Sequence, residues 1–348
     1  MRRFLKKVII LVLPIWALFV ILSLYILYFV HPHVKGDLFK IGMIESGEGY
    51  DVIETGTENK FDEYADNSRL GGAKILTIGD SFFQQGENGI QKYLIQKGFE
   101  VKNLKPSNIN YNPVLYAYYM LKYRANEISN YNIVIIESAE RLLMNRIVET
   151  CFEMDKDTSE DSVLKYPFKI DGFDKTEKLH QKGTDNSPLM NARNFLLFKM
   201  GLGLSPVLSC ELNGDLFSSS EPNKLYFYRD DISNGVNLSE NEKIQVVKVF
   251  NTIESECKNI GVSFLFIVAV DKYDLYQDFI IDNPYPKKSI NEDLRVAICD
   301  NRLVLSKDAL YPHVQRGEKD IFYFNDSHWT NRANRILTGY ILDNLYGE

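Results

Sequence analysis

The chain has 348 residues, of which 45% are hydrophobic, enough for a sizeable core in one large domain or in one domain with an insertion. Its 40 Lys and Arg residues against 47 Asp and Glu residues give a formal net charge of −7 at pH 7. A chain of this charge, with no basic stripe interleaved with aromatic residues, is not expected to bind nucleic acid.

The N-terminus predicts a single membrane-spanning helix. Four basic residues, Arg2, Arg3, Lys6 and Lys7, precede an uncharged stretch at residues 8–30. As a helix this stretch would be roughly 34 Å long, enough to cross a lipid bilayer. The alternative is a cleaved signal peptide, but its apolar region would be shorter, and residues 31–35 contain no small-residue cleavage site. The basic residues predict a cytoplasmic N-terminus in the cell inner membrane, with the remainder in the periplasm or outside the cell.

Three segments are expected. Residues 1–34 form the cytoplasmic N-terminus and transmembrane anchor, and residues 35–72, rich in Gly, Asp, Glu and Asn, read as a linker and an irregular approach to the first strand. Residues 73–348 form the folded domain, with an insertion at about 150–237 that either shapes a substrate groove or is an irregular structural excursion.

Strand-like and helical patterns alternate along the domain. Strands are predicted at Lys74–Ile78, Ile133–Ile136, Ser263–Val270 and Ile321–Phe324, and helices at Ile90–Gly98, Pro113–Tyr123, Glu240–Ile260 and Thr330–Leu345. The second and third strands show no apolar/polar alternation, which is typical of strands covered on both faces. The alternation predicts an α/β fold, doubly wound around a mostly parallel sheet.

The helix from about Glu240 has the clearest boundaries. Ser239 with Glu242 forms a capping box, and Gly261 stands where the helix should stop. Cys257 fits its apolar face and is interpreted as a buried thiol. The four cysteines have no close spacing, which excludes a CxxC-type zinc or redox site; disulfides are permitted but not required, and no cofactor or metal is predicted.

Ser81 is a candidate nucleophile. It follows the Lys74–Ile78 strand, and Gly79 permits a tight turn between them. A serine at this position would present its hydroxyl at the carboxyl edge of the sheet and its N–H toward a developing oxyanion. The alternative is an ordinary turn in which Asp80 or Ser81 caps a helix.

Asp326 and His328 could complete a catalytic triad with Ser81. A carboxylate two residues before the histidine can bond Nδ1 and leave Nε2 facing the nucleophile. The alternatives are a surface Asp-x-His, a metal half-site without further ligands nearby, or a cap for the last helix from Asn325 or Asp326. A serine, an imidazole and a carboxylate together are what acyl transfer requires.

At these residues the chain resembles a known family. The block Lys74–Phe82, with its Gly-Asp-Ser motif, and Asn325–Trp329 are similar to SGNH (GDSL-type) hydrolases; the Asp-x-His-Trp form is closer to membrane-anchored alginate O-acetylation proteins. Residues 135–141 and 270–276 fit the same group, and the resemblance covers much of 73–143 and 262–345. It implies an SGNH/flavodoxin-like three-layer sandwich and a triad of Ser81, His328 and Asp326.

The chain departs from the family in two places. The alginate proteins carry the Asp-His pair before the serine, whereas here the serine comes first, as in ordinary GDSL hydrolases. Where those hydrolases have a Gly-x-Asn-Asp block that completes the oxyanion hole, this chain has Ser138-Ala139-Glu140-Arg141. Arg141 and its neighbour Glu140 are candidate oxyanion or substrate ligands, and a structural ion pair between the two is the equal alternative.

Two further residues are candidates for substrate contact. Lys272 follows a buried-looking strand and has either a substrate or a structural role. Trp329 is either a platform for sugar stacking or a core residue under the last helix, and the core role is favoured.

The resemblance implies a function as well as a fold. We expect a membrane-anchored, extracytoplasmic O-acetyltransferase that modifies a cell-surface polysaccharide through an acetyl-serine intermediate. Its partners would be the polysaccharide acceptor, a multi-span membrane O-acyltransferase as acetyl donor, and the lipid bilayer through residues 8–30. The alternatives are a carbohydrate esterase with the same triad and a non-catalytic scaffold or binding protein of an envelope polysaccharide complex.

Overall fold

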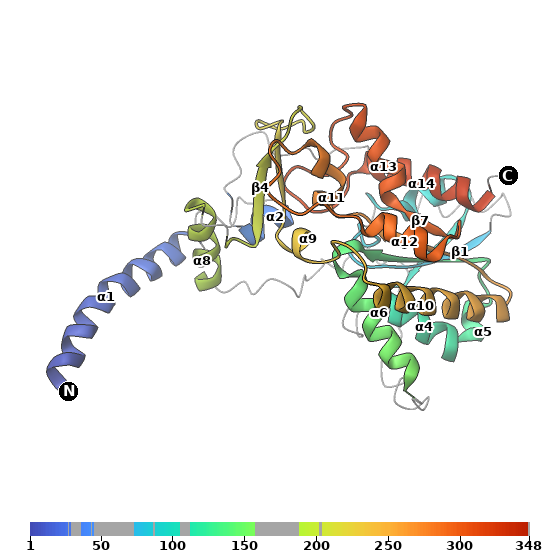
Figure 1. The fold of residues 1–348 in the computed structure, drawn as a ribbon, viewed down its shortest axis with the longest axis horizontal. Coiled ribbons are helices and arrows are strands. Elements are labelled where there is room, and N and C mark those ends of the chain that lie inside the picture. Colours follow the sequence, from blue (N-terminus) through green and yellow to red (C-terminus); the bar gives the residue numbers. More distant parts are fainter. Residues whose placement is uncertain are drawn as a thin grey trace.

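A five-stranded parallel sheet forms the centre of the molecule (Figure 1). The computed structural model describes residues 1–26, 28, 36–42, 44, 73–85, 88–104, 112–156, 188–201 and 204–346. The strand order is β2-β1-β3-β6-β7, with β1 at Lys74–Ile78, β2 at Glu100–Leu104, β3 at Ile133–Ala139, β6 at Ser263–Ala269 and β7 at Leu303–Leu305. The predicted α/β class and parallel sheet are therefore confirmed.

Both faces of the sheet are buried, because successive side chains of each strand enter opposite layers. Ile75, Ile135 and Ile267 belong to one hydrophobic cluster, while Leu76, Ile136 and Val268 belong to the other. This is the physical reason for the unbroken apolar runs of β1, β3 and β6.

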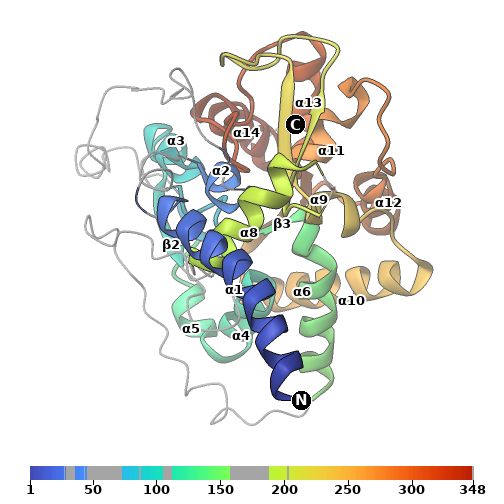
Figure 2. The same ribbon diagram turned by 90° about the vertical axis from the view of Figure 1, so that its left-hand side faces the viewer.

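Helices cover the two faces, as Figures 1 and 2 show. One face packs against α3 (Ile90–Gln96), α13 (Ser306–Gln315) and α14 (Asn331–Tyr346). The other packs against α4 (Pro113–Tyr123), α5 (Ala125–Ile128), α6 (Glu140–Asp155), α10 (Glu240–Asn259) and α12 (Ile290–Ile298). The predicted capping box of α10 is present, with both Ser239 and Glu242 bonded, and Cys257 is buried on this helix.

Regular elements occupy the described part of the predicted insertion. They are α8 (Pro188–Lys199), β4 (Val207–Glu211) and β5 (Lys224–Tyr228), and the two strands form an antiparallel hairpin. The hairpin contacts α2 (Asp37–Gly42), α9 (Asp230–Ser233) and α11 (Lys272–Tyr276), which is followed by the short helix η6 (Gln277–Phe279). Residues 157–187 and 202–203 of this segment lie outside the described residues.

Two sequence interpretations were wrong. Residues 321–324 do not form a strand; Phe322 makes only an isolated bridge to Trp329. The start of the presumed linker is a buried helix, α2, in which Leu38 and Phe39 are fully buried. Residues 45–72 of that segment lie outside the described residues.

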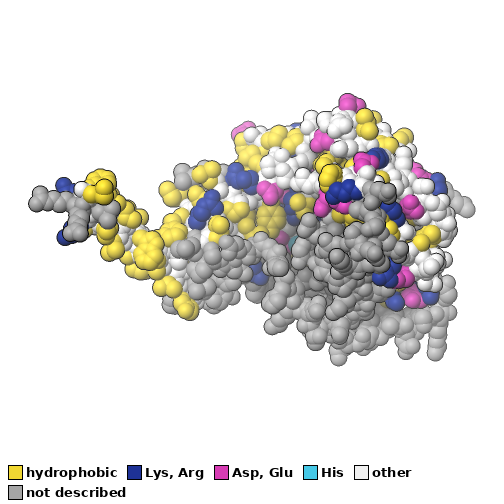
Figure 3. Space-filling view, turned by 90° about the horizontal axis from the view of Figure 1, so that it is seen from below, with side chains coloured by type: hydrophobic (Ala, Val, Ile, Leu, Met, Phe, Trp, Pro, Cys, Tyr) yellow, Lys and Arg dark blue, Asp and Glu magenta, His cyan; other side chains and the backbone are white. Residues whose placement is uncertain are grey.

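Helix α1 (Arg2–Tyr25) is exposed and apolar. Its segment Lys6–Tyr25 has a mean hydropathy of 2.8, and only 6% of it is buried. Figure 3 shows hydrophobic side chains along this helix and basic side chains near its N-terminal end. Its length and composition suffice to cross a membrane, and a signal sequence would have the same properties. Its contacts with the body of the protein are made chiefly with α8.

Candidate active site

Ser81 lies at the point where the order of the strands reverses. From β1 the chain passes first to β2 on one side and then to β3 on the other. In open α/β sheets, ligands bind outside the carboxyl ends of the strands at such a reversal. Ser81 is exposed in the turn that follows β1 there. Neither its hydroxyl nor its N–H forms a hydrogen bond with any of the described residues. Helix α3 begins only at Ile90, with Gly89 at its N-cap, so neither Asp80 nor Ser81 caps it.

Glycine is required at position 79 because the turn passes very close to β3. A Cβ atom there would lie 2.6 Å from Glu137 Oε2 and 2.8 Å from the Cβ of Phe83. The close approach lets Asp80 donate its N–H to Glu137 Oε2 at 2.8 Å. The Gly-Asp-Ser turn is therefore held directly against the end of the neighbouring strand.

The Asp80 carboxylate fastens the serine turn to the start of α6. It accepts hydrogen bonds from the N–H groups of Phe82 at 3.1 Å and Ala139 at 3.0 Å, and from Arg146 at 2.6 Å. Burial alone would raise the pKa of Asp80, but the Arg146 guanidinium and these N–H donors hold it below its usual value. Asp80 thus holds in place the turn that carries Ser81.

Asp326 and His328 form the predicted pair. His328 Nδ1 lies 2.5 Å from Asp326 Oδ1, and Nε2 is buried without a hydrogen-bond partner among the described residues. Burial alone would lower the pKa of His328, but the Asp326 carboxylate raises it to about 9. For Asp326, burial opposes ionisation, and the imidazole and the N–H donors around the carboxylate lower its pKa. A buried, unpaired ring nitrogen costs free energy, and such exceptions deserve a functional explanation.

Packing brings the two candidate segments together. The ring of Phe82, directly after Ser81, lies 5.0 Å from the His328 ring and 4.6 Å from the Trp329 ring, measured between centroids. Trp329 is fully buried, as its favoured core role predicts. No hydrogen bond between Ser81 and His328 is recorded among the described residues. Catalytic contacts are often long in a free enzyme and tighten when substrate binds.

Sequence reasoning missed Asp37, on α2. Its carboxylate accepts hydrogen bonds from Ser327 and lies 3.7 Å from His328 Nδ1. Asp37, Asp326 and His328 place ligand-type atoms within 4.8 Å of one another, a spacing that could hold a metal ion. Because each carboxylate oxygen already accepts an N–H or O–H hydrogen bond, the cluster is satisfied as it stands. The only local signal was an acidic residue before the apolar pair Leu38-Phe39.

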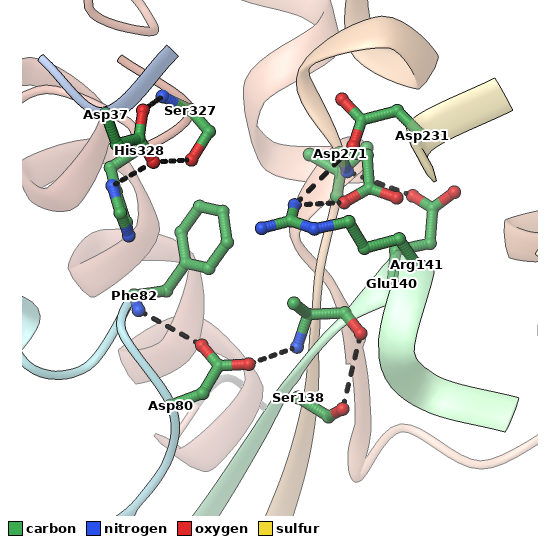
Figure 4. Close-up of polar contacts among 12 residues, drawn as sticks. Asp37, Asp80, Phe82, Ser138, Glu140, Arg141, Asp231, Asp271, Ser327 and His328 are labelled. Atoms are coloured by element: carbon green, nitrogen blue, oxygen red, sulfur yellow. Dashed lines mark hydrogen bonds and ion pairs between the residues drawn. The ribbon is translucent and has the colours of Figure 1, made fainter. Parts of the chain in front are cut away.

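Arg141 and Glu140 point to different partners, so the alternative of an ion pair between them was wrong. Arg141 Nη1 lies 2.8 Å from Asp271 Oδ1 and 3.6 Å from Asp231 Oδ1, and the guanidinium stacks 5.1 Å from the centroid of the Tyr228 ring. In Figure 4 its other terminal nitrogen points away from these aspartates, toward the side where Phe82 and His328 lie.

Glu140 belongs to a buried charged cluster that adjoins Arg141. Lys288 Nζ lies 2.5 Å from Glu140 Oε1 and 3.0 Å from Asp271 Oδ2, and all three side chains are fully buried. Burial raises the pKa of Glu140 well above its usual value, and Asp274 adds to the effect. This cluster is joined to the Arg141 side chain through Asp271, whose carboxylate contacts both Lys288 and Arg141.

Lys272 has a structural role in the described site. Its buried ammonium donates hydrogen bonds to the carbonyls of Tyr323 at 2.6 Å, Phe324 at 2.9 Å and Asp326 at 3.0 Å. Burial lowers the pKa of Lys272 to about 7. By donating to three backbone carbonyls, the Lys272 side chain holds the loop that carries Asp326. Residues 321–324, where a strand was expected, belong to this loop.

The geometry brings Ser81, Asp326 and His328 to one edge of the sheet, with Arg141 and the unforeseen Asp37 around them. Comparison of the chain with protein-family models, with curated proteins and with solved structures finds no match.

Proposed function

We propose that the protein is a membrane-anchored, extracytoplasmic O-acetyltransferase of the SGNH type that acts on a cell-surface polysaccharide. One observation carries the proposal: an Asp326–His328 pair with an unpaired Nε2 is packed, through Phe82, against the turn that exposes Ser81. The strand order supports the SGNH part of it, because β2-β1-β3-β6-β7 is the order of flavodoxin-like sheets, with Ser81 at the reversal.

The chemistry follows from the placement of these groups. His328 Nε2 takes the proton of the Ser81 hydroxyl as Oγ attacks the carbonyl carbon of an acetyl donor. The tetrahedral intermediate collapses to acetyl-serine, and the leaving group takes the proton back from His328. In the second half, His328 deprotonates a sugar hydroxyl, whose oxygen attacks the acetyl carbonyl. The bond to Ser81 Oγ breaks, His328 returns its proton to that oxygen, and the acetylated sugar and free Ser81 are released.

The N-terminal helix supports transfer rather than free hydrolysis. If α1 anchors the chain with its N-terminus in the cytoplasm, the domain stays beside a multi-span membrane acyltransferase that supplies the acetyl group. The exposure of Ser81 favours the second candidate, a carbohydrate esterase, because water can reach the acetyl-serine. Both candidates use the same triad and differ only in the acceptor.

The first prediction concerns the acetyl-serine. Full-length protein in detergent, incubated with an activated acetyl ester, is expected to gain one acetyl group by intact mass, and Ser81→Ala and His328→Ala are expected to lose this adduct. An adduct that persists at full level in Ser81→Ala contradicts the proposal. Added polysaccharides then separate the two candidates, since transfer yields acetylated glycan and hydrolysis yields free acetate.

Arg141 is proposed as the second oxyanion donor, beside the N–H of Ser81. Its Nη1 is held by Asp231 and Asp271, while its other terminal nitrogen has no recorded hydrogen bond among the described residues. A guanidinium fixed in this way is preorganised, which is the property that makes an oxyanion donor effective.

The second prediction tests this role. Arg141→Met is expected to slow Ser81 acetylation by about 10²- to 10³-fold, the usual cost of removing one oxyanion donor. Arg141→Lys should recover part of the rate, because it restores a positive charge near Asp231 and Asp271 without the planar fork. Single-turnover rates measure the effect. The control is Arg302→Met, which alters a partly exposed guanidinium paired with Asp300 and Glu254. Folded Arg141→Met with the wild-type rate would exclude Arg141.

A further inference from the structure

Asp37 forms three hydrogen bonds with the loop at residues 325–328, which we call the catalytic loop. Its N–H donates to Asp326 Oδ2 at 3.0 Å, its Oδ1 accepts the N–H of Ser327 at 2.6 Å, and its Oδ2 accepts the Ser327 hydroxyl at 2.5 Å. The same Oδ2 lies 3.7 Å from His328 Nδ1. Asp37 is therefore joined to each residue of the Asp326-Ser327-His328 segment, although it lies almost the whole domain away in sequence.

Helix α2, which carries Asp37, packs closely against the catalytic loop. Gly36, with φ of +81°, sits where a Cβ atom would lie 2.1 Å from the carbonyl oxygen of Asn325, so only glycine fits there. The Phe39 N–H donates to the same carbonyl at 3.4 Å, and the Phe39 ring lies 5.0 Å from the Tyr226 ring and 5.8 Å from the Phe324 ring. Both the backbone and the side chains of α2 therefore contact the catalytic loop.

Charged and titratable groups from four other elements act on Asp37 or on His328. Asp326 and His328 come from the loop before α14, Tyr228 from β5, Lys272 from α11 and Arg141 from α6. Asp37 and Asp326 act on His328 in the same direction, because both favour the imidazolium, whereas Arg141 opposes it. His328 thus faces two carboxylates rather than one.

We propose that Asp37 is a positioning residue of the catalytic centre: from α2 it holds the Asp326-Ser327-His328 segment and supplies a second carboxylate beside the His328 imidazole. The inference rests on the proposed function and extends it. It also ties the site to the N-terminal helix, because α1 ends at Tyr25 and the 12 residue steps from there to Asp37 span at most about 43 Å when fully extended. If α1 spans a bilayer, this length limits how far Asp37 can lie from the membrane.

The third prediction is a shift in pH dependence. Catalysis needs a neutral His328, so the rate of Ser81 acetylation should rise with pH toward a midpoint near the His328 pKa of about 9. Asp37→Asn removes a negative charge that favours the imidazolium, so the midpoint should move down by about 1 pH unit or more. Single-turnover acetylation of the full chain, measured from pH 5 to 10, gives the midpoint.

The controls separate charge from structure. Asp278→Asn, the same substitution at a partly exposed carboxylate bonded to Lys287 and Tyr311, should leave the midpoint unchanged. Ser327→Ala removes a hydrogen bond to Asp37 but keeps its charge, and its midpoint should not fall by the same amount. Asp37→Ser is the second charge-removing variant, in case Asp37→Asn unfolds.

Each outcome decides the inference. If the midpoint is unchanged in folded Asp37→Asn or Asp37→Ser, the inference about Asp37 is overturned. The proposed function stands in that case, because the wild-type protein still acetylates Ser81. If both variants unfold in thermal melts, Asp37 is a stability residue and the inference is likewise overturned. An acetyl adduct that persists in Ser81→Ala contradicts the proposed function itself, independently of Asp37.

Discussion

Asp326→Asn is expected to lower the plateau rate of Ser81 acetylation by about 10³- to 10⁴-fold. The Asp326 carboxylate lies 2.5 Å from His328 Nδ1 and holds the proton on that nitrogen. An amide at this position can instead donate to Nδ1 and drive the proton to Nε2. The imidazole would then have no lone pair facing Ser81, and general-base catalysis would fail.

The pH profile distinguishes this effect from a general loss of structure. Removal of the Asp326 charge should also lower the pKa of His328 and move the midpoint of the rate below the wild-type value near 9. A lower plateau with a lower midpoint is therefore expected, measured by single-turnover acetylation across pH. The control is again Asp278→Asn, and a wild-type plateau in Asp326→Asn would contradict the triad.

Lys288→Met is expected to lower the free energy of unfolding by about 3–5 kcal/mol, the usual cost of breaking a buried ion pair by removal of one partner. The Lys288 side chain has no exposed surface, and its ammonium is shared between Glu140 and Asp271. Methionine fills similar volume but leaves two carboxylates buried without this cation, and burial already raises the pKa of Glu140. Urea unfolding followed by the fluorescence of the buried Trp329 measures the change.

The adjacent lysine provides a matched control. The Lys287 side chain is 74% exposed and pairs with Asp278 at 2.8 Å. Lys287→Met should change the free energy of unfolding by less than about 1 kcal/mol, because exposed ion pairs contribute little. The double variant Glu140→Gln with Lys288→Met should be less destabilised than the sum of the two single variants. Equal effects at positions 287 and 288 would contradict the buried cluster.

Local patterns predicted the parts of the fold that have strong local causes. The apolar runs of β1, β3 and β6 are continuous because both faces of these strands are covered, and the boundaries of α10 follow from its capping box and terminal glycine. The strands β2 and β7 were not predicted from the sequence, because β2 is an edge strand with mixed polar residues and β7 has only three residues. The apolar run at 321–324 is instead a loop whose carbonyls are taken by Lys272.

The sequence by itself determined the α/β class, the apolar N-terminal helix and the candidate pairing of Ser81 with Asp326 and His328. These rest on residue types, short spacings and periodic patterns, which are local properties. Only the tertiary structure decided what surrounds them: Asp37 against His328, Lys288 against Glu140, and Arg141 turned away from its neighbour Glu140 toward Asp231 and Asp271. The reason is that a buried charge takes whichever partner the folded chain brings within reach, and most of these partners lie more than a hundred residues away.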